Sequence, residues 1–309
     1  MEFADFENLY MTARQIRDDF APQMGPWFRG DAAQWPPVIG FSLPSDCREV
    51  KLVTVGLNPS HREIENGHIP ATDDAKAQWE AQTGYFKGRN QLDWFDRSEI
   101  VLTASGVGIY HSNGPVHLDL SPQPTSGGFD RVYDGDASGA ERKAARRFIE
   151  QCITKILLPT LNALVRDNCA RVILIYGFVP EVDGHSKKGN RTMRETIGRV
   201  ENLFRDIEVD SNPGHIAIAR GKFNAQNDWI SPYPALQKVR IVFLSRGPSY
   251  YSGSHEMRAQ EELGAAGKRL RRLRWLRSLP KFCLSVLLAV ASALLAVTWL
   301  IVRCAHPSG

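Results

Sequence analysis

Four short, mainly apolar runs, each followed by a small or polar residue, punctuate the first 250 positions of the chain. Such runs predict buried strands at residues 52–55, 116–120, 171–176 and 239–244. Between them, apolar residues recur with helical spacing, which predicts helices over about residues 5–20, 140–166 and 192–204. Pro159 is expected to kink or divide the second of these helices. Strands alternating with helices predict an α/β fold, with three α/β/α layers around a mainly parallel central sheet.

Residues 282–302 form an apolar run of 21 positions without a charge. As a helix this run would be about 31 Å long, which matches the roughly 30 Å hydrocarbon core of a bilayer. Trp299, Lys281 and Arg303 stand at or near its ends, where interfacial anchors are expected. A buried core helix is the alternative, but such helices are seldom this long without a charged residue. The run therefore predicts a single C-terminal transmembrane helix.

The segment before this span, residues 268–277, interleaves Lys and Arg with Leu and Trp. This pattern is typical of an amphipathic helix on an anionic membrane surface, and a nucleic-acid-binding helix is the alternative. The positive bias predicts that the preceding domain faces the cytoplasm, from an anchor in the cytoplasmic membrane. The expected organisation is a helical and irregular region at 1–44, an α/β domain at 45–255, a linker and basic amphipathic segment at 256–281, and the transmembrane helix at 282–302.

Charge and cysteine content limit the classes of function. The chain has a formal net charge of +4, but residues 268–309 contain eight basic side chains and no acidic one. Subtracting those eight charges leaves residues 1–267 at −4, so a nucleic-acid-binding surface on the domain would have to be a local patch. The five cysteines are scattered without metal-ligand spacing, and no phosphate-binding P-loop motif is present. We therefore expect neither a metal nor a cofactor.

Two loops that follow predicted strands combine glycine, proline and small polar residues. The first is Gly56-Leu57-Asn58-Pro59-Ser60, and the second is Arg246-Gly247-Pro248-Ser249-Tyr250-Tyr251. A third strand-end segment, from Asp119 to Thr125, lies between them in the sequence. The carboxyl ends of parallel strands share one edge of a sheet, which is where α/β folds bind ligands. The three segments therefore predict one site.

The order of these motifs resembles the uracil-DNA glycosylase superfamily, especially its mismatch-specific and single-strand-selective branches. That family begins with Gly-[Ile/Met]-Asn-Pro-Gly and ends with a [His/Asn]-Pro-Ser loop, and the resemblance covers about residues 45–255. It implies that Asn58 positions the attacking water and that Asp119 lies near the position of a base-recognising Asn. The other residues expected to contact the base, the water or DNA are Gly56, Leu57, Pro59, Ser60, His61, Thr125, Arg246, Gly247, Pro248, Ser249, Tyr250 and Tyr251.

Two departures from the family pattern affect the predicted chemistry. Gly247 stands where the family has His or Asn, and Ser60 replaces the last Gly of the first motif. Asp119 matters for the substrate, because an ionised carboxylate only accepts hydrogen bonds and suits the exocyclic amine of cytosine. Three alternatives stay open: Asp119 capping its own loop through an Asx-turn, His61 as a solvated loop residue, and Tyr250 or Tyr251 as a core residue.

The sequence thus predicts a membrane-tethered DNA glycosylase that acts on a flipped base, a modified cytosine rather than uracil, with DNA and the membrane as partners. Defence against foreign DNA is one setting that fits the anchor. A non-catalytic nucleic-acid or nucleotide-binding sensor on the same fold is the alternative, favoured by Gly247. A third hypothesis is a membrane protein whose soluble domain binds another protein, and no protein partner is identified.

Overall fold

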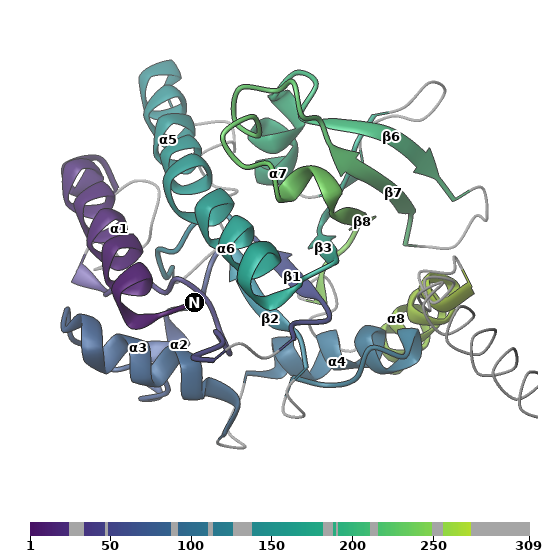
Figure 1. The fold of residues 1–309 in the computed structure, drawn as a ribbon, viewed down its shortest axis with the longest axis horizontal. Helices are drawn as coiled ribbons and strands as arrows, with labels where there is room; N and C mark the ends of the chain where they lie inside the picture. The colour runs from purple at the N-terminus through teal and green to yellow at the C-terminus, as the bar shows by residue number, and fades with distance from the viewer. Residues whose placement is uncertain are drawn as a thin grey trace, which may run out of the picture.

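A computed structural model provides the structure of the chain (Figure 1). It describes residues 1–24, 34–46, 49–87, 92–110, 114–125, 138–181, 188–189, 191–210, 216–248 and 256–272. The predicted transmembrane helix at 282–302 lies outside these residues, and so do Ser249, Tyr250 and Tyr251.

Six strands form the central sheet, in the order β2-β1-β3-β8-β7-β6. Their bounds are Val53–Gly56 for β1, Val116–Asp119 for β2, Val172–Tyr176 for β3, Phe204–Val209 for β6, Ile218–Phe223 for β7 and Arg240–Leu244 for β8. The first four strands in this order are parallel to one another. Strand β7 pairs antiparallel with β8, and β6 pairs antiparallel with β7. A small antiparallel pair, β4 (Phe178–Val179) and β5 (Lys188–Gly189), forms a separate two-stranded sheet. The prediction of an α/β fold with a mainly parallel sheet is confirmed.

The expected long helix after β2 is present, but its middle is not α-helical. Helix α5 (Gly139–Cys152) continues through a π-helical turn (Ile153–Leu157) into α6 (Leu158–Asn168). Pro159 is the second residue of α6, and a proline has no N–H to donate and clashes with the carbonyl four residues earlier. The widened turn accommodates Pro159 within a continuous helix, as helices do at π-bulges.

The helix predicted at residues 192–204 is wrong for most of its length. Helix α7 ends after five residues (Arg191–Glu195), a 3₁₀ turn follows at Ile197–Arg199, and the chain enters β6 at Phe204. Asn202 adopts a left-handed backbone conformation, with φ of 54°, which turns the chain into the strand. Strands β6 and β7 were not predicted. In β6, a pairing irregularity between Arg205 and Glu208 interrupts the alternation of apolar and polar residues.

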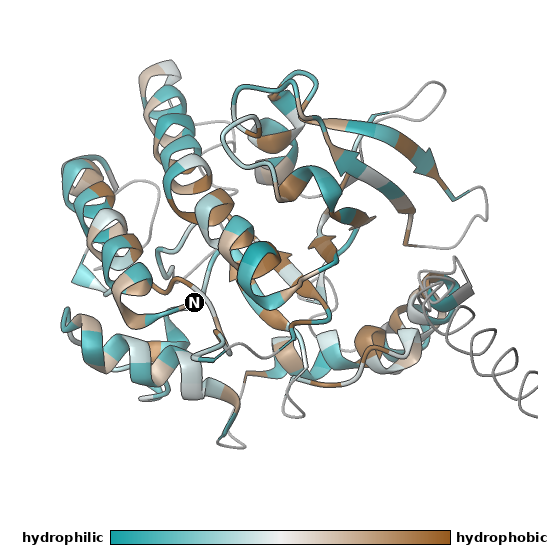
Figure 2. Cartoon of the chain, in the orientation of Figure 1, coloured by the Kyte–Doolittle hydropathy of each residue, from teal (hydrophilic) through white to brown (hydrophobic). Residues whose placement is uncertain are grey.

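The apolar residues of the sheet are divided between two clusters of buried side chains. In β3, Ile173 and Ile175 pack in one cluster with residues of α1 (Phe3–Met24), α5 and α6. Leu174 and Tyr176, which alternate with them, pack in the other cluster with residues of α4 (Asp93–Ser105) and α8 (Glu256–Arg272). Figure 2 shows this concentration of apolar residues on the central strands and on the adjacent helix faces.

Helix α8 corrects the predicted domain boundary. Residues 256–272 were expected to form a linker and the start of a membrane-surface helix, but Leu263, Ala266 and Leu270 are buried beside α4. The two helices approach so closely that a Cβ atom at Gly267 would lie 2.6 Å from the Cβ of Ala104. Residues 256–272 therefore belong to the folded domain, and their apolar face contacts protein.

Among the described residues, one helix is long and apolar enough to cross a membrane, the continuous helix Gly139–Asn168. Residues of both of its α-helical halves, such as Phe148 and Leu161, belong to the core cluster that covers one face of the sheet. Its apolar character is therefore explained by packing within the domain.

Candidate active site at the carboxyl edge of the sheet

The first predicted loop and the segment after β2 run side by side beyond the ends of their strands. The amide of Ser121 donates to the carbonyl of Leu57 at 3.0 Å, and the amide of Thr125 donates to the carbonyl of Pro59 at 3.1 Å. In return the amide of His61 donates to the carbonyl of Thr125 at 3.0 Å. These bonds extend the parallel pairing of β1 and β2 and bring together two motifs that are more than 60 residues apart in the sequence.

Asn58 is held by both hydrogens of its amide group. Its Nδ2 donates to Thr125 Oγ1 at 2.6 Å and to the carbonyl of Pro59 at 2.9 Å. No residue that the structure describes donates to Oδ1, so this oxygen is available as an acceptor on a half-buried side chain. An amide oxygen fixed in this way can orient a water molecule, although a neutral amide is not a strong base.

Asp119 ends β2 directly opposite Gly56, the last residue of β1. Its side chain is 4% exposed, and Oδ1 lies 3.4 Å from Nε2 of His117. A Cβ atom at position 56 would lie 2.4 Å from Oδ1 of Asp119 and within 3.2 Å of the His117 ring. The glycine of the first motif is therefore required because the Asp119 carboxylate occupies the space where a side chain would stand.

A chain of buried polar groups leads from Asp119 into the core. Nδ1 of His117 lies 2.8 Å from Oγ1 of Thr54, which lies 2.9 Å from the hydroxyl of Tyr110. Ser98 Oγ connects that hydroxyl, at 3.0 Å, to the hydroxyl of Tyr176, at 2.7 Å. Burial raises the pKa of both tyrosines, which keeps them neutral. The network fixes the ring of His117 and, through it, the Asp119 carboxylate.

Glu63 is a buried acidic residue near the first loop that no sequence pattern indicated. It belongs to α2 (Arg62–Glu65), and its side chain is only 2% exposed. Tyr85 donates its hydroxyl hydrogen to Oε2, and Nδ1 of His68 lies 3.3 Å from the same oxygen. Burial raises the pKa of Glu63 to about 7, the negative charge of Asp119 acts in the same direction, and the hydrogen bond from Tyr85 opposes them. Nothing in the sequence distinguishes Glu63 from the exposed Glu65.

The remaining residues of the first loop have local roles. Leu57 packs against the core, Pro59 is buried, and Ser60 Oγ accepts from the amide of Arg62 at 3.3 Å. The ring of His61 stacks on Trp35, with 5.3 Å between centroids. Its Nδ1 lies 3.1 Å from the carbonyl of Thr125, and its Nε2 lies 3.2 Å from Glu65. Both ring nitrogens of His61 thus face protein acceptors.

The second predicted loop follows β8 at the same edge of the sheet. Ser245 is bonded in both directions to Ala217, next to the start of β7, and beyond it Arg246 and Gly247 are half-buried and Pro248 is buried. Strand β8 is two places from β1, a separation of about 10 Å at the usual strand spacing. The two loops therefore share an edge, and among the described residues no hydrogen bond or ion pair joins Asn58 or Asp119 to Arg246, Gly247 or Pro248.

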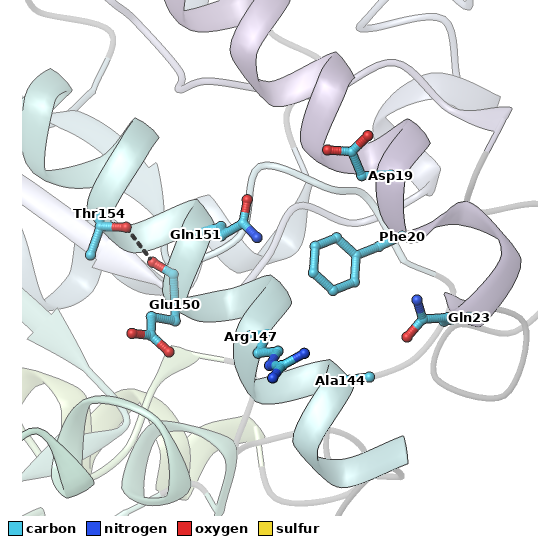
Figure 3. Close-up of a pocket in the computed structure, with 8 residues that line it drawn as sticks. All are labelled: Asp19, Phe20, Gln23, Ala144, Arg147, Glu150, Gln151 and Thr154. Atoms are coloured by element: carbon cyan, nitrogen blue, oxygen red, sulfur yellow. Dashed lines mark hydrogen bonds between the residues drawn. The ribbon is translucent and has the colours of Figure 1, made fainter. Parts of the chain in front are cut away.

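A hollow of about 590 Å³ lies elsewhere, between α1 and α5 (Figure 3). Its lining consists of Asp19, Phe20, Gln23, Ala144, Arg147, Glu150, Gln151 and Thr154. None of these residues belongs to the predicted site, and the charges are mixed. The described residues contain no group of three or more His, Cys, Asp or Glu side chains that could hold a metal ion.

Comparisons of the chain with protein-family models, with curated proteins and with solved structures found no match.

Proposed function

We propose that the chain is a DNA N-glycosylase that removes a flipped base of cytosine type. The observation that carries the proposal is the orientation of Asn58. Thr125 and Pro59 bind both amide hydrogens, and Oδ1 remains as an acceptor at the strand edge where Asp119 also lies. This is the arrangement that a water-positioning amide requires.

The proposed reaction breaks the bond between the base and its sugar. Positive charge develops on the sugar and negative charge on the base, as in the oxocarbenium-like transition state of glycoside hydrolysis. Asn58 Oδ1 accepts a hydrogen bond from the water, whose oxygen forms the new bond to the sugar carbon. The base departs with the electron pair of the broken bond and takes up a proton, while the attacking water loses one. Asp119 accepts from the exocyclic amine of the extruded base.

The proposal also includes the layers of the fold, the membrane anchor and the biological setting. The two buried clusters on opposite sides of the sheet support a three-layer arrangement, with α1, α5 and α6 on one face and α4 and α8 on the other. Residues 282–302 would anchor the domain in the cytoplasmic membrane, with the domain in the cytoplasm. Defence against foreign DNA is the setting we propose for such an anchored enzyme.

A non-catalytic sensor of nucleic acid or nucleotides is the second candidate, and a specific observation favours it. Gly247 has no side chain to steady a departing base, whereas the resembling family has His or Asn at that position. A sensor would bind the same flipped base without releasing it.

The test uses the full chain in detergent with oligonucleotides that contain one cytosine, 5-methylcytosine, 5-hydroxymethylcytosine or uracil. Mass spectrometry identifies the released base under single-turnover conditions. We expect the wild type to release a cytosine-type base. In Asn58→Ala the rate of base release should fall roughly 100-fold or more while DNA binding is retained, because removal of one preorganised group costs about that much. Asn66→Ala is the matched control, since Asn66 is an exposed asparagine eight residues further on. Unchanged release by Asn58→Ala would refute the mechanism, release of uracil alone would refute the substrate, and binding without release would establish the sensor.

A further inference from the structure

Glu63 and Asp119 are two buried acidic side chains that lie close enough for the charge of Asp119 to affect Glu63. The ring of Phe41 contacts a polar partner of each of these two side chains. Phe41 packs edge-on against Tyr85, the hydrogen-bond donor to Glu63, with 4.7 Å between centroids. The same ring stacks at 5.7 Å on His117, the partner of Asp119.

The hydrogen bonds that the structure describes for the Glu63 side chain all involve one of its two oxygens. Tyr85 and His68 both approach Oε2, and no residue that the structure describes donates to Oε1. The backbone of Glu63 is also fixed, because its amide donates to Ser60 at 3.1 Å and its carbonyl accepts from Ile69 at 2.8 Å. A buried carboxyl with an unused oxygen is costly unless a proton or a ligand satisfies it.

Burial disfavours the ionised form of the Glu63 carboxyl group, and the negative charge of Asp119 acts in the same direction. The groups facing Glu63 are His68, Tyr85 and the Asp119 carboxylate, and burial is the strongest influence among them. The proton therefore stays on Glu63 into the neutral range. The pair then presents a hydrogen-bond donor at Glu63 and an acceptor at Asp119.

We infer that Glu63 is a second base-recognising residue, and that its carboxylic acid donates to a ring nitrogen while Asp119 accepts from the adjacent exocyclic amine. The ligand class is a base with an amidine edge, such as cytosine. Uracil presents the opposite pattern, a ring N–H beside a carbonyl, and would leave both carboxyl groups mispaired. This inference rests on the proposed function for its setting, and it assigns the base specificity of the site to two residues.

The experiment compares the full chain with Glu63→Gln and Glu63→Ala between pH 5.5 and 9. A glutamine amide donates at every pH, so it replaces the carboxylic acid and does not titrate. Wild-type release of a cytosine-type base should fall at least tenfold as pH rises through about 7, the pKa of Glu63, whereas Glu63→Gln should stay constant over the same range. Glu63→Ala should be slow at every pH. Glu80→Gln, an exposed position on α3 (Ala75–Gly84), is the matched control and should follow the wild type.

A second measurement separates recognition from catalysis. The probes are oligonucleotides that contain 2′-fluoro-deoxycytidine or 2′-fluoro-deoxyuridine, whose glycosidic bonds resist cleavage. We expect the wild type to bind the fluorocytidine probe more tightly at pH 6 than at pH 9, and this difference should be lost in Glu63→Gln. That result supports the inference even if no base is ever released. Base release with identical pH profiles in wild type and Glu63→Gln overturns it and leaves the glycosylase proposal intact. Equal binding of both probes at pH 6 also overturns it.

Discussion

The carboxylate of Asp119 lies over Gly56, at the point where two parallel strands end side by side. Gly56 opens the motif that contains Asn58, and Asp119 is 63 residues further along the chain. The contact therefore places a candidate base-recognising group beside the first residue of the motif that contains Asn58, and it explains why a side chain at position 56 is excluded.

Gly56→Ala should destabilise the domain and impair the site. The added methyl group would meet Asp119 Oδ1 at 2.4 Å in a packed environment, which we expect to cost about 1–3 kcal/mol in the free energy of unfolding. Gly139→Ala is the control, because a Cβ atom there has no neighbour within 4 Å. Urea denaturation measures both variants, and equal stabilities would show that Asp119 does not fill this space.

Thr125 should act on catalysis through the orientation of Asn58. Thr125→Val removes the oxygen that accepts from Asn58 Nδ2 and preserves the shape of the side chain. We expect the rate constant for base release to fall about 10–100-fold, with little change in substrate affinity, because the amide loses a fixed orientation. Thr125→Ser should restore most of the rate in single-turnover measurements. A rate for Thr125→Val equal to that of the wild type would contradict this role.

Glu63 should make the stability of the domain depend on pH. Its pKa is raised from 4.5 to about 7, so the folded protein binds more protons than the unfolded chain between these values. The contribution of Glu63 is therefore complete below pH 4.5 and is lost as pH rises through 7, a difference of about 3 kcal/mol for a fully buried group. Glu63→Gln should be more stable than the wild type at pH 8, with the gap closing towards pH 4.5. A gap of constant size in urea denaturation would exclude this titration.

In the hydrogen-bonded chain that begins at His117, removing the central hydroxyl should destabilise the domain more than removing the terminal one. The Tyr110 hydroxyl lies between Thr54 and Ser98, whereas the Tyr176 hydroxyl contacts Ser98. Tyr110→Phe removes two hydrogen bonds and should cost about 1–3 kcal/mol in unfolding free energy, and Tyr176→Phe should cost about 1 kcal/mol. Chemical denaturation measures the unfolding free energy of both variants, and far-UV circular dichroism verifies that they fold. A larger loss of unfolding free energy in Tyr176→Phe than in Tyr110→Phe would contradict the prediction.

Helix α8 should contribute to the stability of the α/β domain. Leu263→Ala removes a fully buried side chain beside α4 and should cost about 2–5 kcal/mol, as such truncations usually do. Lys268→Ala, at an exposed position on the same helix, should change stability by less than about 0.5 kcal/mol. If both variants match the wild type in thermal denaturation, residues 256–272 are a linker after all.

The sequence by itself determined the parallel strands and the position of the strand-end loops. Apolar β-branched runs such as residues 171–176 have few alternatives to a buried strand, and glycine and proline mark where they end. The same logic located Asn58 and Asp119 at one edge of the sheet. The apolar pattern did not predict β6 and β7, where it is interrupted. It also did not predict that α8 packs in the domain, because basic residues alternate there with the apolar ones.

Only the tertiary structure decided which polar residues meet. Glu63 and Glu65 lie two positions apart and differ in burial because α2 turns the first towards Tyr85 and leaves the second exposed. His117 and Thr54 are indistinguishable from other strand residues until parallel pairing sets them beside each other. Local sequence determines whether a segment forms a strand or a loop, whereas pKa shifts, hydrogen-bond networks and occupied space arise from neighbours that are distant in the chain.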